Sequence, residues 1–86
     1  MRYVSKPVVI EAISFLGPYS VDEMRVEWGA AFADAAVYRA EGNELVIHTM
    51  EGLMRADLGD YIIKGTINEF YLCKPQVFET KYAPAE

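Results

Sequence analysis

Two lysines flank two aromatic residues near the C-terminal end of the chain: Lys64 and Lys74 lie on either side of Phe70 and Tyr71. A lysine beside an aromatic ring is the smallest pairing that can hold a nucleotide, because the cation binds a phosphate and the ring stacks on a base. The same residues also fit a strand-end lysine in water and a core tyrosine whose hydroxyl reaches the surface. On spacing alone this second interpretation is the commoner one.

Groups for catalysis are few. His48 is the only imidazole and Cys73 the only thiol, so a Ser-His-Asp or Cys-His arrangement would have to use His48. No Gly-x-Ser-x-Gly motif and no glycine-rich phosphate loop is present. The acidic residues do not follow metal-ligand spacing, and one histidine with one cysteine cannot form a zinc cluster. We therefore expect a binding protein without catalytic residues, metal or cofactor.

The net charge of the chain argues against two classes of binding partner. The formal net charge is −5, whereas nucleic-acid polymers and anionic membranes attract basic surfaces. Neither partner is expected, although a few local donors can still bind a small anion. The N-terminus lacks the apolar segment of a signal peptide, and the apolar run 8–10 is too short to span a bilayer. These features favour a cytoplasmic location.

Size and composition predict one domain, residues 1–86, that associates with itself. A chain this short buries only about 60% of its unfolded surface, yet 52% of its residues are apolar and 13% are aromatic. Such a composition fits either a dense single core or a homo-oligomer, because obligate interfaces resemble a core cut in half. We expect a dimer or a tetramer.

The pattern of apolar residues and turn formers predicts an α+β fold. It comprises a small, mostly antiparallel sheet of five or six short strands, a central helix over about residues 20–35 and a short C-terminal helix over about residues 75–82. Ser20 is the predicted cap of the first helix. Phe78 and Tyr82 share one side of the second and are expected to dock onto the sheet. The strands are predicted at residues 7–15, 36–39, 44–50, 53–58, 61–64 and 69–73.

Helical spacing defines one apolar stripe on the central helix, and a Trp within such a stripe is more often core or interface than a ligand platform. The stripe consists of Val21, Met24, Trp28, Ala31, Phe32 and Ala35.

The clearest hairpin is predicted between residues 44–50 and 53–58, with Glu51 and Gly52 as its two-residue turn. In that register His48 lies opposite Arg55 on a mixed face. The other face has the character of a core and carries Leu45, Ile47, Thr49, Met54, Ala56 and Leu58.

Three segments resemble a widespread group of short bacteriophage and prophage proteins. They are KPVVIEA at residues 6–12, LVIHTMEG at 45–52, and the signature GDYIIKG at 59–65 with EFYLCKP at 69–75, continuing through Phe78, Glu79 and Tyr82. Together they cover about half of the chain in the same order. The chain departs from the usual pattern at Asn68, where glycine is common, and at Leu72, where proline is common.

This group is similar to anti-CBASS proteins of phages that sequester cyclic dinucleotide signals, such as 3′,3′-cyclic GMP-AMP, without cleaving them. The resemblance implies an immune-evasion protein of the host bacterial cytoplasm that holds the ligand between subunits. Lys64 and Lys74 would then bind phosphates, with Arg55 and Lys6 as weaker candidates. Tyr71 would stack on a base, and His48 would donate to a phosphate or a base edge.

Two alternatives come from other classes. The chain could be a phage accessory protein that binds a host protein through Trp28 and the mixed face of the hairpin. It could also be a minor component of the virion.

Overall fold

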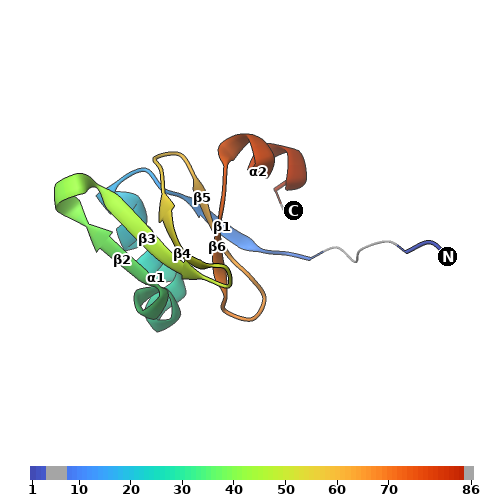
Figure 1. Cartoon of the computed structure of the whole chain (residues 1–86), viewed down its shortest axis with the longest axis horizontal. Coiled ribbons are helices and arrows are strands. Elements are labelled where there is room, and N and C mark those ends of the chain that lie inside the picture. Colours follow the sequence, from blue (N-terminus) through green and yellow to red (C-terminus); the bar gives the residue numbers. More distant parts are fainter. Residues whose placement is uncertain (4–7, 85–86) are drawn as a thin grey trace.

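The computed structural model describes residues 1–3 and 8–84, and its six strands form two antiparallel sheets of three strands each (Figure 1). The elements are β1 (Glu11–Ser14), α1 (Pro18–Ala35), β2 (Ala36–Arg39), a 3-10 turn (Ala40–Gly42), β3 (Glu44–Thr49), β4 (Gly52–Ala56), β5 (Tyr61–Lys64), β6 (Phe70–Cys73) and α2 (Pro75–Lys81). Sheet A has the order β1-β5-β6 and sheet B the order β2-β3-β4. The predicted α+β fold is confirmed, with the strands divided between two sheets rather than joined in one.

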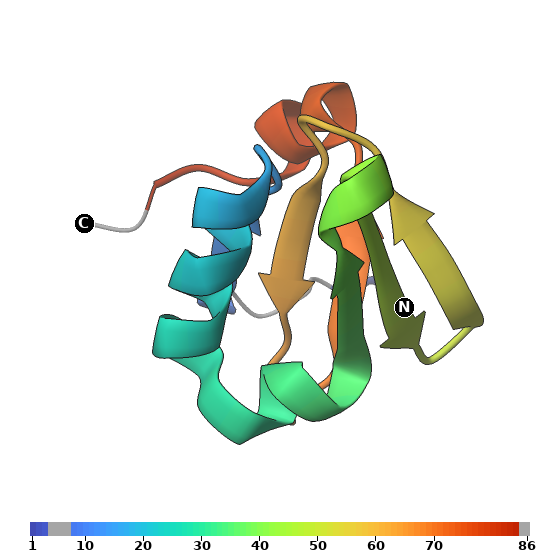
Figure 2. The same ribbon diagram turned by 90° about the vertical axis from the view of Figure 1, so that its left-hand side faces the viewer.

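Helix α1 lies along one side of the strands and supplies the main core (Figure 2). Its predicted apolar stripe is confirmed, since Val21, Met24 and Phe32 are almost fully buried. Trp28 is only 6% exposed, which makes it a core residue. Its ring centroid lies 5.8 Å from that of Phe32 and 5.5 Å from that of Phe70 on β6. This aromatic cluster holds α1 against sheet A.

The two ends of α1 differ from a regular helix for local reasons. The helix begins at Pro18, whose missing N–H costs nothing in the first turn, so the prediction of Ser20 as the cap is wrong. The Ser20 hydroxyl donates to the Gly17 carbonyl at 2.6 Å and accepts from the Leu16 N–H at 2.8 Å. Near the other end, Gly29 has φ 58° and ψ −140°, a backbone conformation that only glycine adopts readily. This residue kinks the helix before it leads into β2.

The opposite face of sheet A carries a second, smaller cluster under α2. Pro75 occupies the start of this helix, as predicted. The Phe78 ring stacks on that of Tyr61 from β5, with 3.8 Å between centroids, and Tyr82 packs against Phe78. Ile63 on β5 is fully buried on this face. The predicted docking of the C-terminal helix is therefore confirmed, and sheet A is covered on both faces.

The hairpin β3–β4 has a different turn from the predicted one. Its turn residues are Met50 and Glu51, with Thr49 opposite Gly52 and His48 opposite Leu53. The Thr49 hydroxyl explains the choice, because it donates to the Gly52 carbonyl at 2.9 Å and accepts from the Glu51 N–H at 3.1 Å. The predicted pairing of His48 with Arg55 is wrong.

The strand side chains of this hairpin nevertheless lie on the predicted faces. The observed register is shifted by two residues from the predicted one, and side chains alternate between the two faces with period two, so the shift moves no side chain to the other face. Leu45, Ile47, Thr49 and Ala56 are buried on the core side. Met54 is 39% exposed at its margin, and Leu58 lies beyond the strand and is exposed.

Candidate functional site

Lys64 and Tyr71, the first cation and ring of the predicted site, lie on opposite faces of sheet A. Lys64 pairs with Phe70 and Ile63 pairs with Tyr71, so the register places the two side chains on different sides. Lys64 points to the α1 side, where its Nζ lies 3.5 Å from Glu11 Oε2. The other oxygen of Glu11 accepts a hydrogen bond from Trp28 Nε1 at 3.2 Å. Lys64 thus neutralises a carboxylate that also satisfies the core indole.

Lys74 lies beyond the other end of β6, where it holds two carboxylates. Its Nζ lies 2.9 Å from Asp57 Oδ2 and 3.1 Å from Asp60 Oδ2. The hydrogen bond from Lys74 lowers the pKa of Asp57, and the bonds to both carboxylates raise the pKa of Lys74. The same oxygen of buried Asp60 accepts the Asp57 N–H at 2.9 Å. This triad ties the loop after β4 to the start of α2.

The remaining predicted cations lie elsewhere. Arg55 is on β4, with its Nη1 3.3 Å from Glu44 Oε2, and Arg39 approaches the other oxygen of Glu44 at 4.0 Å. His48 is exposed on β3, on the same outer face of sheet B as Arg55. Lys6 lies outside the described residues. Lys64, Lys74 and Arg55 each contact an acidic side chain, and they lie on different parts of the fold. One copy of the chain therefore does not bring these cations together around Tyr71.

Tyr71 lines a hollow between β6 and the tip of the β3–β4 hairpin, with a volume of about 310 Å³. Burial raises the pKa of Tyr71, and the neighbouring Tyr82 hydroxyl adds to this rise. Among the described residues that line the hollow, one side chain is acidic and none is basic. The lining consists of Thr49, Met50, Glu51, Met54, Tyr71 and Leu72. The hollow offers a ring and apolar walls, but no cation of its own.

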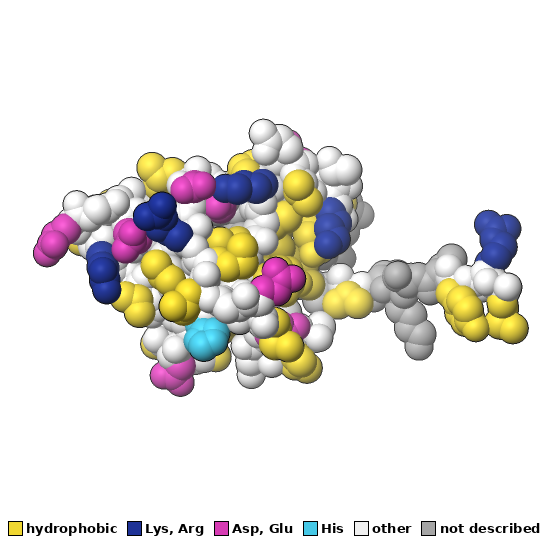
Figure 3. Space-filling view, in the orientation of Figure 1, with side chains coloured by type: hydrophobic (Ala, Val, Ile, Leu, Met, Phe, Trp, Pro, Cys, Tyr) yellow, Lys and Arg dark blue, Asp and Glu magenta, His cyan; other side chains and the backbone are white. Residues whose placement is uncertain are grey.

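The outer face of sheet B is the most exposed apolar surface on paired strands. Val37 on β2 is opposite Val46 on β3, which is opposite Arg55 on β4, while Leu53 is opposite His48. Val37 is 56% exposed and Leu53 is 74% exposed. We call these five residues the sheet B face. Figure 3 shows hydrophobic side chains there, with basic and acidic ones around them. Sequence reasoning identified the β3–β4 part and missed Val37, although alternation along residues 36–39 indicates its side.

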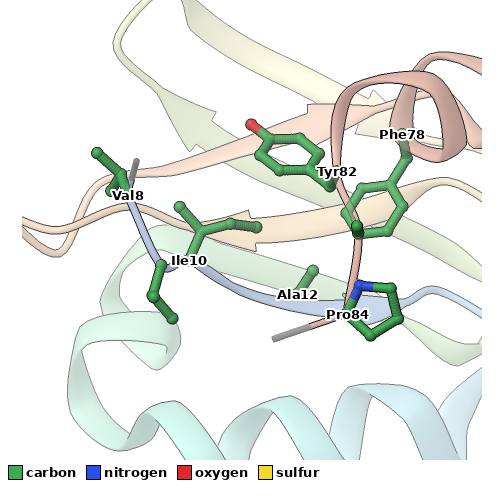
Figure 4. Close-up of a pocket in the computed structure, with 8 residues that line it drawn as sticks. Val8, Ile10, Ala12, Phe78, Tyr82 and Pro84 are labelled. Atoms are coloured by element: carbon green, nitrogen blue, oxygen red, sulfur yellow. The ribbon is translucent and has the colours of Figure 1, made fainter. Parts of the chain in front are cut away.

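A second apolar feature lies beside β1 and was not predicted as a site. A groove of about 420 Å³ runs between the N-terminal side of β1 and the C-terminal segment, and it is lined by Val8, Val9, Ile10, Ala12, Phe78, Tyr82, Ala83 and Pro84 (Figure 4). Its signal in the sequence is the β-branched run at residues 8–10.

Residues 1–3 and 8–84 show neither a metal site nor a membrane-spanning helix. No group of three or more His, Cys, Asp or Glu side chains there could hold a metal ion. None of the helices in this part of the chain has the length and apolar character to cross a membrane.

The arrangement as a whole offers surfaces for association, and the cations contact carboxylates at the edges of those surfaces. Comparison with known protein families, characterised proteins and solved structures found no match for the chain. The relation to the phage proteins accordingly stays a prediction from the three matching segments.

Proposed function

We propose that this chain is a non-catalytic binding protein that takes a protein partner on the sheet B face. The observation that carries the proposal is the exposure of Val37 and Leu53, at 56% and 74%, on a face that neither α1 nor α2 covers. One face of an antiparallel sheet often meets water, but that face is then usually polar. Exposed apolar side chains on both outer strands of such a face are typical of an interaction surface.

The charged side chains beside these apolar residues match the polar rim of a protein–protein interface. The exposed side chains of Arg39 and Arg55 flank the half-buried carboxylate of Glu44, with ion pairs at 4.0 and 3.3 Å. Rim charges of this kind orient a partner and affect its association rate more than its final affinity. The best fit is a partner with an apolar centre and acidic groups at its margin, since both arginines share a single carboxylate. In the phage context implied by the resemblance, that partner is a host protein.

The test is a pair of matched leucine substitutions. Leu53→Asp introduces a charge beside His48 on the sheet B face, and we expect it to weaken partner binding at least tenfold, about 1.4 kcal/mol. Leu16→Asp makes the same change at a 70% exposed position between β1 and α1, outside that face, and is expected to leave binding unchanged. A protein captured from host lysate by the unaltered chain is identified, purified and titrated against both variants. Equal affinity for the two variants, or no host protein captured, would contradict the proposal.

A second candidate, sequestration of a cyclic dinucleotide, is supported by the resemblance and by the ring of Tyr71 at the hollow beside β6. Because Lys64 and Tyr71 lie on opposite faces of sheet A, this function requires cations from another copy to complete the site. Stacking on a base contributes about 1–3 kcal/mol. We therefore expect Tyr71→Ala to weaken binding of 3′,3′-cyclic GMP-AMP about tenfold in calorimetry, and Tyr19→Ala, at an 89% exposed ring, to have no effect. Absence of heat at high protein concentration would end this second candidate.

A further inference from the structure

In the part of the chain that the structure describes, strand β1 has a neighbouring strand on one edge and none on the other. It is one of the two outer strands of sheet A, in the order β1-β5-β6. The backbone of Phe15 bonds toward the β5 side, since its N–H donates to the Asp60 carbonyl and its carbonyl accepts from the Gly59 N–H, both at 2.8 Å. Backbone direction alternates along a strand. The odd-numbered residues of this segment therefore face β5, and the N–H and C=O groups of Val8, Ile10 and Ala12 point to the outer edge.

The chain continues this edge beyond its last pair with β5. The ladder starts at Glu11, opposite Lys64, and residues 8–10 precede it in an extended line (Figure 1). Val8 is 60% exposed and Val9 is 76% exposed. Natural sheets protect an exposed edge with charged side chains or proline. Residues 8–14 contain one such residue, Glu11, whose carboxylate is paired with Lys64 of the neighbouring strand. An apolar edge with unused backbone groups is a template for another strand.

The groove adds a side-chain site to this backbone site. Val8, Ile10 and Ala12 line it from the strand, and Phe78, Tyr82 and Pro84 close it from the C-terminal side (Figure 4). None of the residues within 8–84 that line the groove is charged. An occupant that adds a strand to β1 would place every second side chain into it, so its alternate residues must be apolar.

We propose that the occupant is a second copy of this chain, paired antiparallel through the two β1 edges about a two-fold axis. When this axis is perpendicular to the sheet, each residue lies on the same face in both copies. Opposite residues share a face, so they must both have odd numbers or both have even numbers. Centring the pair on Glu11 would place two like charges opposite each other, which is destabilising. Centring it on Ile10 places Ile10 opposite its own copy, Val8 opposite Ala12, and Val9 opposite Glu11.

This register makes the contact complementary to itself, as a two-fold interface requires. Each copy provides the groove and also the apolar side chain, Val8, that enters the groove of the other copy beside Ala12. The two sheets A then form one continuous sheet across the dimer. Electrostatics favours the same place, because each chain carries a net charge of −5 and the groove is an uncharged surface on which two acidic chains can meet.

The test uses the predicted neighbour of Val9 in the other copy. Val9→Glu places a carboxylate opposite Glu11 at both ends of the pair, whereas Val9→Lys places an ammonium group there. The two variants change the same exposed side chain, so neither is expected to disturb the fold of one copy. By sedimentation equilibrium up to millimolar protein, we expect the unaltered chain to dimerise, Val9→Glu to weaken the dimer at least tenfold, and Val9→Lys to retain or strengthen it.

Three results would overturn the inference. The unaltered chain could remain a monomer throughout the concentration range. Val9→Glu could leave the dimer unchanged, which would place the contact on another surface. The two variants could weaken it equally, which would exclude Glu11 as the neighbour. Addition of an unrelated strand in place of a second copy would appear as the first of these results.

Discussion

Phe70→Ala is expected to lower the free energy of unfolding by about 3–5 kcal/mol, the usual cost of removing a buried aromatic ring. Phe70 is 1% exposed, and its ring centroid lies 5.5 Å from that of Trp28 and 5.8 Å from that of Phe32. Truncation therefore opens a cavity where α1 meets sheet A. Because small domains have a total stability of only about 5–15 kcal/mol, this single substitution removes a large part of the stability of the fold.

Urea denaturation measures the effect. Circular dichroism is the appropriate signal, because the substitution removes a ring that contacts Trp28 and so alters the tryptophan fluorescence itself. Tyr19→Ala is the matched control: it removes an aromatic ring that is 89% exposed, and it should change the stability by less than about 0.5 kcal/mol. Phe70→Leu should fall between the two. A loss below about 1 kcal/mol for Phe70→Ala would mean that the aromatic cluster does not hold α1 in place.

The helical stripe could be predicted from the sequence because its cause is local. Val21, Met24, Trp28 and Phe32 recur at the spacing that places side chains on one face of a helix, and all four are buried. The alternation along β3 likewise predicted which side of the hairpin is core, because period two holds whichever residues form the turn. The turn itself was missed, since the choice depends on the Thr49 hydroxyl, which bonds on both sides of the turn.

The candidate site could not be predicted because its electrostatics depend on residues far apart in the sequence. Lys64 meets Glu11 across 53 positions, and Lys74 meets Asp57 across 17. A sequence shows the lysines, but the ion pairs arise only when β5 aligns with β1 and the loop after β4 folds back onto α2. The opposite faces of Lys64 and Tyr71 follow from the β5–β6 register, which the turn at residues 65–69 sets. Residue type alone therefore favoured a cluster that one copy of the chain does not form.

Asp60→Ala is expected to lower the free energy of unfolding by about 2–3 kcal/mol, because a buried carboxylate that accepts two hydrogen bonds is lost. Its side chain is 4% exposed, and its Oδ2 accepts from the Asp57 N–H at 2.9 Å and from Lys74 Nζ at 3.1 Å. The substitution leaves that N–H without its acceptor. In a domain of this size, each kcal/mol lowers the melting temperature by about 4–8 °C, so calorimetry should resolve the loss easily.

Asp57→Ala is the matched control, since it removes the exposed carboxylate that binds the same lysine, and we expect the smaller loss there because solvent screens an exposed pair. The pH dependence separates the two. The pKa of Asp57 is lowered by Lys74, so its contribution is present above its unfolded pKa and disappears as the pH falls through the folded value. The pKa of Lys74 is raised by both carboxylates, so its contribution is present below its unfolded pKa and disappears as the pH rises through the folded value. Asp57→Ala should remove the acid-side effect and also weaken the alkaline one, because Asp57 is the larger cause of the raised pKa of Lys74. Asp60→Ala should keep the acid-side effect and weaken the alkaline one less. Equal losses and identical pH profiles for the two variants would show that burial of Asp60 adds nothing to an exposed ion pair.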